Sequence, residues 1–391
     1  MTRNVGLALS GGGSRAIAFH LGCLRALYDR GILERIQVLS AVSGGSVIAA
    51  MYAYSEGSFE EFDKAVVALL RRGIQRDIAW KLANPFVAAT IIATIVLAGS
   101  AAAASDLSRI ALNFGSSMLG LRNSKLFTVL KKLQPPFPRW ASTTTAFESV
   151  LRDRVVGDKT IGCSRRGDFH VVLNACELRS GSAFRFGSLE SGCWRYGLVE
   201  GNAVNVAHAV AASAAYPAIL PALDETLKFI DRKGAQSKAR VLLTDGGVYD
   251  NLGVTCLEPN APREFNYSHF SPDYIVCCDA GQGIFQSYPV PYLWGQRMVR
   301  AFDSVFRKAQ NATQNRLHLL ASTGQIKEFV LSYLGQIDER VPYAPADLIK
   351  REEVFEYPTD FRAMRETDIN RLAKRGEQLT RSLVAFYCPE L

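Results

Sequence analysis

The sequence predicts an α/β protein with a mostly parallel central sheet. Twice near the start, a short apolar strand runs through a glycine-rich turn into an apolar helix; the strands are Val5–Leu9 and 38–42. Further apolar runs of strand length follow at 169–174, 241–244 and 274–278. Strands that alternate with helices in this way are typical of α/β proteins.

Composition places the chain among globular proteins with a large core. The 391 residues are 48% hydrophobic and 21% charged, so global disorder is excluded. The net charge of +8 favours anionic surfaces, although an ordinary soluble surface rich in Lys and Arg explains it equally. There is no basic stripe with interleaved aromatics, so nucleic acid is not an expected partner.

The cysteines and the N-terminus indicate a reducing setting. None of the eight cysteines forms a C-x-x-C pair, and several lie in apolar runs, as buried free thiols do. We therefore expect no metal site. We also expect no signal peptide before the first strand, and hence a cytoplasmic protein.

The first glycine-rich turn has the composition of an anion-binding loop. Gly11, Gly12 and Gly13 directly precede a helix, and the N–H groups of Gly12 and Gly13 can point at a developing negative charge. The helix has apolar residues at helical spacing and ends near Gly31. Taken alone, this loop is weak evidence for any phosphate site.

The second turn places a serine at a sharp corner. Ser43 follows an apolar strand, and Gly44 and Gly45 open the next helix. This is the strand–turn–helix context of the G-x-S-x-G elbow, which exposes a nucleophilic hydroxyl. The simpler alternative is that Ser43 only caps the helix.

A carboxylate ends a later strand. Asp245 follows the apolar run 241–244, and Gly246 and Gly247 let the chain turn away. Sites in open parallel sheets collect at the carboxyl ends of strands, so we expect Asp245 to meet Ser43 there. The alternatives are that Asp245 is only a turn residue, or that Asp279, at the end of another strand, is the acid.

These three segments resemble the patatin-like phospholipases, a family of serine lipid acyl hydrolases. The segment 211–221 also resembles the family's A-S-x-A-x-P sequence, and the similarity covers roughly residues 4–281. The resemblance implies a three-layer α/β/α fold and a phospholipid or other acyl-lipid substrate, with no cofactor. It implies the following roles: Ser43 as nucleophile, Asp245 as its base, Gly11, Gly12 and Gly13 as the oxyanion loop, and Arg15, Gly44, Gly45, Gly246 and Gly247 as supporting residues.

Two positions depart from the family pattern. Ala41 replaces the first glycine of the elbow, which requires that its φ be negative, and Ala16 replaces the last glycine of the oxyanion loop. Ala41 keeps open a non-catalytic lipid-binding member of the same fold. A Ser-His-Asp esterase is a further alternative and would require His269 or His318. A nucleotide-binding protein is disfavoured because the first loop lacks the ending of a P-loop.

The chain divides into a catalytic domain at 4–282 and a mainly helical extension at 283–391. Long helices are expected at 298–322 and 361–386 in the extension. The catalytic domain contains an uncharged insertion at about 82–105, preceded by Arg71, Arg72, Arg76 and Lys81.

About 20 apolar residues suffice to cross a bilayer as a helix, so this insertion is long enough to do so. A single crossing would separate Ser43 from Asp245, which must touch to work. The open alternatives are a helix that docks on or re-enters the membrane, a buried cap or oligomer contact, and a crossing paired with a second one. The membrane surface is therefore an expected partner, while the oligomeric state stays open.

Overall fold

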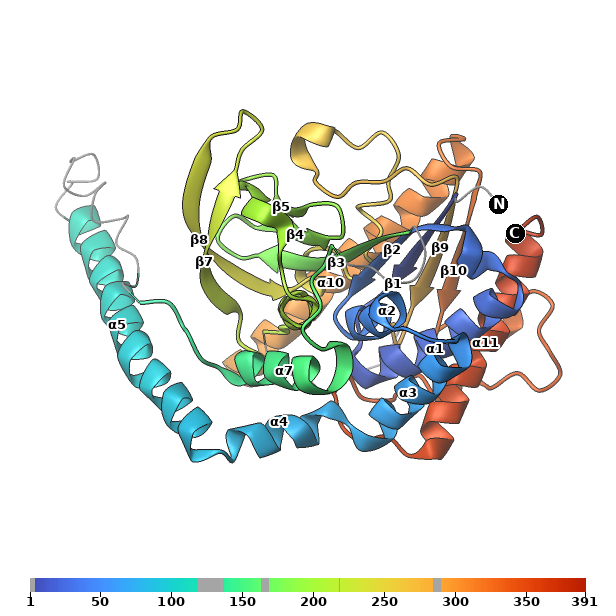
Figure 1. Cartoon of the computed structure of the whole chain (residues 1–391), viewed down its shortest axis with the longest axis horizontal. Helices are drawn as coiled ribbons and strands as arrows, with labels where there is room; N and C mark the ends of the chain where they lie inside the picture. The colour runs from blue at the N-terminus through green and yellow to red at the C-terminus, as the bar shows by residue number, and fades with distance from the viewer. Residues whose placement is uncertain (1–3, 119–134, 136, 163–168, 218, 284–289) are drawn as a thin grey trace.

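The computed structural model describes residues 4–118, 135, 137–162, 169–217, 219–283 and 290–391. These residues form a mixed sheet in the order β10-β9-β1-β2-β3-β4-β5-β6-β7-β8, with helices on both sides (Figure 1). This confirms the predicted α/β class with C-terminal helices. The strands are β1 Val5–Leu9, β2 Ile36–Val42, β3 His170–Glu177, β4 Ser182–Gly187, β5 Ser191–Cys193, β6 Gly197–Val199, β7 Leu223–Ile230, β8 Gln236–Asp245, β9 Tyr274–Asp279 and β10 Glu328–Tyr333.

Half of the sheet is parallel. The strands β10, β9, β1, β2 and β3 run side by side in one direction, so their carboxyl ends share one edge. Their buried residues alternate between the two faces, as in a sheet covered on both sides. The edge strand β10 lies in the C-terminal region, which was expected to be mainly helical.

The other half is antiparallel and returns to the first. The strands β4 to β8 form a continuous antiparallel run, and β8 also pairs with the end of β3, where Ala175 faces Asp245. Asp245 thus reaches the edge shared by the parallel strands from the opposite direction. The run at 241–244 is therefore the end of a longer antiparallel strand.

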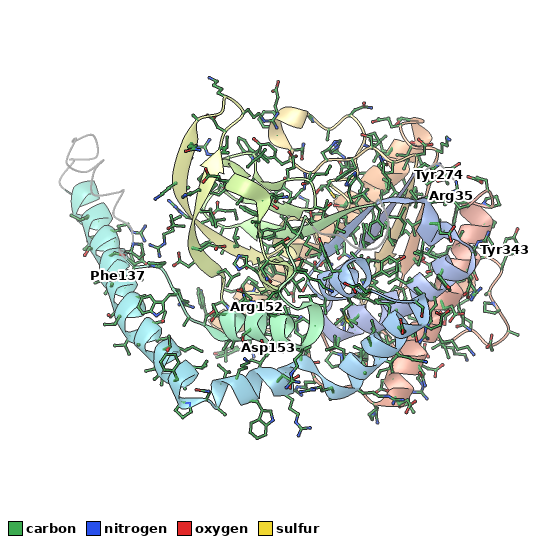
Figure 2. The ribbon with its side chains drawn as sticks, in the orientation of Figure 1. Arg35, Phe137, Arg152, Asp153, Tyr274 and Tyr343 are labelled. Carbon is green, nitrogen blue, oxygen red and sulfur yellow. The ribbon has the colours of Figure 1, made fainter. Side chains whose placement is uncertain are left out.

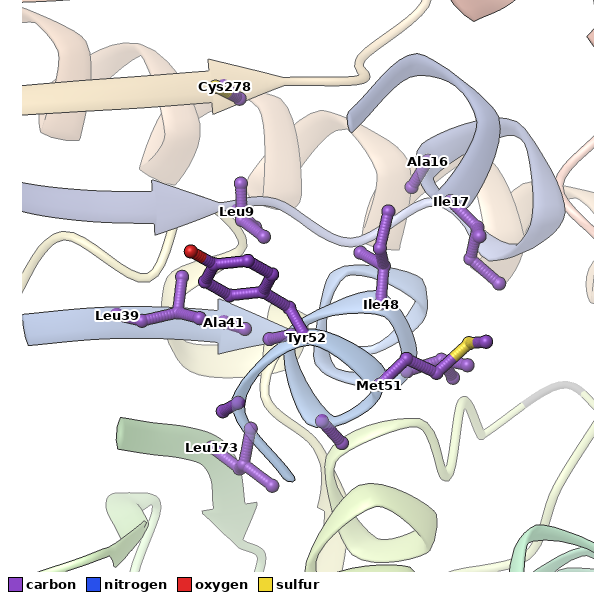
Figure 3. Close-up of a cluster of buried hydrophobic side chains, with 14 of the residues drawn as sticks. Leu9, Ala16, Ile17, Leu39, Ala41, Ile48, Met51, Tyr52, Leu173 and Cys278 are labelled. Atoms are coloured by element: carbon purple, nitrogen blue, oxygen red, sulfur yellow. The ribbon is translucent and has the colours of Figure 1, made fainter. Parts of the chain in front are cut away.

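The helices form layers on the two faces of the sheet. On one face, side chains of β1, β2, β3 and β9 pack against α1 and α2, as Figure 3 shows for Leu9, Leu39 and Leu173 with Ile48 and Tyr52. On the other face, α10 contributes Leu317 and Leu320 to a second cluster. The helices are α1 Gly13–Asp29, α2 Gly44–Tyr54, α3 Phe59–Arg72, α4 Ile74–Leu82, α5 Pro85–Met118, α7 Thr143–Leu151, α8 Val206–Ser213, α9 Gly247–Asp250, α10 Trp294–Ser322 and α11 Glu366–Tyr387.

The helices α1 and α11 approach each other unusually closely. A Cβ on Gly22 of α1 would lie 1.7 Å from the carbonyl oxygen of Ala373, and one on Gly376 of α11 would lie 2.2 Å from that of Phe19. Only glycine permits this backbone contact at both positions. The C-terminal region therefore completes the sheet through β10 and one helical layer through α11.

The uncharged insertion forms α5, which stands away from the body at the left of Figure 1. Its stretch Pro85–Leu112 is long and apolar enough to cross a membrane, with a mean hydropathy of 2.1 and only 11% of its most apolar window buried. Ile92, Val96 and Leu107 are each more than half exposed. The alternative of a buried cap is therefore wrong.

Both flanks of α5 are attached to the same body. Before it, Lys81 of α4 pairs with Asp153, which lies in the turn after α7 (Figure 2). After it, Arg240 of β8 donates to the carbonyl oxygen of Phe137, and the N–H of Arg139 donates to a carboxylate of β7. The described residues before and after α5 are thus attached to the same body.

Candidate active site

Ser43 occupies a strained corner between β2 and α2. Its φ of 52° and ψ of −120° are rare for a non-glycine residue. Such strain persists only where the surroundings impose it, and it is frequent at functional sites. Here Ser213 accepts the Ser43 N–H at 3.0 Å and donates its own hydroxyl to the carbonyl oxygen of Asn174 at 2.6 Å.

Asp245, at the end of β8, is held against Ser43. Its carboxylate accepts the N–H of Gly247 at 2.7 Å and faces the Ser43 hydroxyl. Burial raises the pKa of Asp245 to about 6, and the Ser43 hydroxyl and the Gly247 N–H limit that rise. A carboxylate with this pKa is ionised at neutral pH yet a better proton acceptor than an ordinary aspartate.

The first glycine-rich turn lies beside this pair. A Cβ on Gly11 would be 3.3 Å from the Cβ of Ser43, and the Gly11 N–H already donates to the carbonyl oxygen of Asn251 at 3.1 Å. Gly12 and Gly13 have φ values of 145° and 60°, and within the described residues no acceptor binds their N–H groups. Two backbone donors next to Ser43 therefore remain available to an incoming oxygen.

Close backbone contacts explain the glycines around Ser43. A Cβ on Gly44 would lie 2.3 Å from the carbonyl oxygen of Gly13, and one on Gly45 would lie 2.5 Å from that of Leu9. A Cβ on Gly246 would lie 2.2 Å from the carbonyl oxygen of Asn174. These glycines bring the three turns together at one point.

Arg15 and Asp279 lie at the end of β9 beside the first glycine-rich turn, where a Cβ on Gly12 would lie 3.2 Å from the Arg15 guanidinium. Arg15 is buried and donates to the carbonyl oxygens of Ala280 and Tyr357, and burial lowers its pKa to about 10. Arg15 thus ties α1 to the end of β9. Asp279 accepts from Gly281 and from a glutamine of α10, so the carboxylate of the alternative acid has donors other than Ser43.

Both departures from the motif are sterically accommodated. Ala41 lies within β2 and is not among the residues with positive φ, so its methyl group packs in the core. Ala16 is buried in α1, where alanine favours the helix. Neither substitution displaces the backbone of the two turns.

The histidines needed for a triad lie elsewhere. His269 is hydrogen-bonded to the carbonyl oxygen of Glu258, and His318 packs edge-on against Phe329. Among the described residues, the groups that act on the pKa of the Asp245 carboxylate are Ser43 and Gly247, and neither is a histidine. The geometry therefore favours a two-residue arrangement over the triad.

Three polar residues support the two turns in ways that the sequence did not predict. Ser213 accepts the N–H of Ser43 and donates to the carbonyl oxygen of Asn174, and the carbonyl oxygen of Asn251 accepts the N–H of Gly11. Ser213 did stand in the segment 211–221, but only as part of a sequence pattern. A polar residue within a buried strand or a small-residue helix is the signal that could have indicated Asn174 and Ser213.

Comparison with known proteins identifies the class of this fold and site. Residues 7–257 match the family model described as patatin-like phospholipase. The chain belongs to the patatin-like phospholipase family, whose members are lipid acyl hydrolases. A search of curated protein sequences finds no match.

The similar solved structures include human GIVD cytosolic phospholipase A2, with a TM-score of 0.53, 11% identity, and coverage of 97% of this chain and 61% of that one. Its complex with methyl γ-linolenyl fluorophosphonate and terbium chloride has a TM-score of 0.50, 13% identity, and coverage of 97% and 57%. VipD from Legionella pneumophila has a TM-score of 0.37, 13% identity, and coverage of 98% and 67%. The two human structures support the fold, and this chain spans only about three fifths of their length.

Proposed function

We propose that the protein hydrolyses fatty-acyl esters of phospholipids or related lipids with a dyad of Ser43 and Asp245. The observation that carries the proposal is the position of the Ser43 hydroxyl beside the buried Asp245 carboxylate, close enough to lower its pKa. A serine hydroxyl becomes an effective nucleophile when a base within hydrogen-bond reach takes its proton. The same arrangement, with the negative φ of Ala41, disfavours a non-catalytic lipid-binding protein.

In the first half-reaction, the Ser43 oxygen attacks the ester carbonyl carbon while its proton passes to Asp245. The N–H groups of Gly12 and Gly13 stabilise the oxyanion, helped by the positive ends of α1 and α2. The alcohol then leaves with the proton from Asp245, and the acyl group remains on Ser43. Water, deprotonated by Asp245, releases the fatty acid and restores the hydroxyl.

Product analysis tests the proposal. We expect the purified wild-type protein, incubated with a mixed lipid extract, to release fatty acids and the matching lysolipids, which mass spectrometry identifies. Ser43→Ala protein should release none. If both proteins leave every lipid intact, the proposed reaction is wrong.

Gly44→Ala should lower kcat strongly, because the new Cβ would lie 2.3 Å from the carbonyl oxygen of Gly13 and would force the serine and the oxyanion loop apart. Loss of one oxyanion donor corresponds to about 3 kcal/mol of barrier, or on the order of a hundredfold in rate. The measurement is kcat on a soluble short-chain ester. Gly99→Ala is the control, since its Cβ meets nothing within 4 Å.

We further propose that α5 attaches the protein to a membrane from the cytoplasmic side, as a docking or re-entrant helix. Support comes from its exposed apolar surface and from the attachment of both flanks to the same body. The basic residues of α3 and α4 precede it. The seven described cysteines are buried free thiols, which suits a reducing compartment.

Ile95→Asp should detach the protein from membranes. Ile95 is 57% exposed on α5, and a charge there opposes insertion by about 3 kcal/mol, on the order of a hundredfold in partitioning. Flotation with lipid vesicles measures the effect. Leu189→Asp, at a residue 62% exposed outside α5, is the matched control. Equal flotation of the two variants would contradict a membrane role for α5.

A further inference from the structure

The first half of α10 carries an apolar stripe that faces solvent. Trp294, Met298 and Val305 are 78%, 51% and 69% exposed, and Ala301 between them is also exposed. Their spacing of four, three and four residues places them on one side of the helix. A surface helix normally turns such a stripe toward the core.

The opposite side of α10 makes the contacts to the body. Gln310 and Gln314 donate to the buried carboxylate of Asp279 at 2.8 and 3.4 Å. Farther along, Leu317 and Leu320 are buried in the second core cluster. The helix is thus attached through its second half, and the apolar stripe of its first half is left outward.

Basic and aromatic residues accompany the stripe. Between 294 and 308 the helix has four basic residues, namely Arg297, Arg300, Arg307 and Lys308, against one acidic residue. That residue, Asp303, pairs with Arg300 at 3.3 Å. Tyr292 and Leu293, just before the helix, are 81% and 62% exposed. Exposed aromatic and aliphatic residues beside Arg and Lys are typical of helices that lie in a membrane interface.

The first half of α10 lies near the dyad. The helix α10 packs against α9, which begins two residues after Asp245. Burial, followed by the charges of Asp303 and Asp245, raises the pKa of Tyr216, so Tyr216 lies within electrostatic reach of both the helix and the dyad. Figure 1 shows α10 crossing one face of the sheet.

We propose that this outward face of α10, formed by Tyr292, Leu293, Trp294, Met298 and Val305 with Arg297 and Lys308, docks on an anionic phospholipid bilayer. Docking would bring the lipid surface to the first half of α10, independently of α5. The choice of a bilayer rests on charge complementarity and on the combination of aromatic and basic residues. That this docking serves lipid hydrolysis rests on the proposed function, but the test of docking does not depend on hydrolysis.

Fluorescence quenching by brominated lipids tests insertion directly. The vesicles contain phosphatidylglycerol and phosphatidylcholine with brominated acyl chains, and every protein carries Ser43→Ala so that no lipid is consumed. We expect Trp294→Phe to remove a clear part of the quenching seen with the parent. Trp194→Phe, at a tryptophan 41% exposed on another part of the fold, should leave it unchanged. Equal quenching in the parent and Trp294→Phe would overturn the proposal.

Charge reversal provides a second readout. Each basic residue near an anionic surface contributes about fivefold in affinity, so Arg297→Glu with Lys308→Glu should weaken vesicle binding by at least about tenfold. The control is Lys233→Glu with Lys238→Glu, two exposed positions of the β7–β8 hairpin. Unchanged binding would overturn the proposal. A second outcome would also overturn it: sedimentation shows a dimer, and Val305→Asp dissociates this dimer without weakening vesicle binding. The outward face of α10 would then bind a second copy of the chain.

A soluble short-chain ester separates the two failures. If the wild type hydrolyses it but the α10 variants bind vesicles normally, the docking proposal fails and the proposed function stands. If the ester is not hydrolysed but Trp294→Phe still loses quenching, the proposed function fails and the docking surface stands.

Discussion

Ser43→Ala should abolish ester hydrolysis and leave the fold intact. The variant removes the only atom proposed to bond covalently to the acyl group, and the methyl group fits where the hydroxyl stood. Removing a serine nucleophile from a hydrolase lowers kcat by several orders of magnitude, so we expect a loss of at least about 10⁴-fold. The assay is kcat on a soluble short-chain ester, with the circular dichroism spectrum as evidence of folding.

Labelling with a fluorophosphonate identifies the reacting residue. Fluorophosphonates react with activated serine nucleophiles, so such a probe should modify Ser43. Wild-type protein and Ser55→Ala, a change at the far end of α2, should both be labelled, and Ser43→Ala should not. Labelling of Ser43→Ala at another serine, with activity retained, would assign the nucleophile to that residue.

Local chemistry made much of the site predictable from sequence. Ser43 and the Gly11–Gly13 turn each lie within a few residues of a strand and a helix, so composition indicates the backbone shape directly. The strands Val5–Leu9 and Tyr274–Asp279 were placed nearly to the residue, because buried parallel strands are continuous apolar runs. The long helix α10 was also expected, with its start four residues too late.

Features set by distant contacts were not predictable in this way. The strand β10 has only three consecutive apolar residues, 329–331, and its pairing with β9 makes it a strand. Most of β7 is polar and half exposed, so it has no apolar run to indicate it. Likewise, Asn251 gives no local sign that its carbonyl oxygen binds Gly11 from 240 positions away. Pairing partners, rather than residue types, decide these elements.

Burial of the Asp245 carboxylate lowers the stability of the fold at neutral pH. Burial raises its pKa from 3.8 to about 6, so the folded state holds a proton that the unfolded chain releases earlier. Below pH 3.8 both states are protonated and burial of the charge has no effect. As the pH rises through 3.8 toward 6, stability falls, and above pH 6 the full penalty remains. A shift of about two pKa units corresponds to about 3 kcal/mol.

Asp245→Asn should therefore separate activity from stability. Asparagine cannot accept the proton, so kcat should fall by at least about a thousandfold, and the wild-type kcat/KM should decline below about pH 6. Denaturant titration gives the free energy of unfolding of each protein. The value for the variant minus the value for the wild type should be larger at pH 8 than at pH 4, by up to about 3 kcal/mol. Asp224→Asn, in the ion pair with Arg240 on the β7–β8 hairpin, is the control and should show no such gain at pH 8. A difference that is the same at both pH values would mean that the Asp245 carboxylate is not held at a raised pKa beside Ser43, and that another group takes the proton.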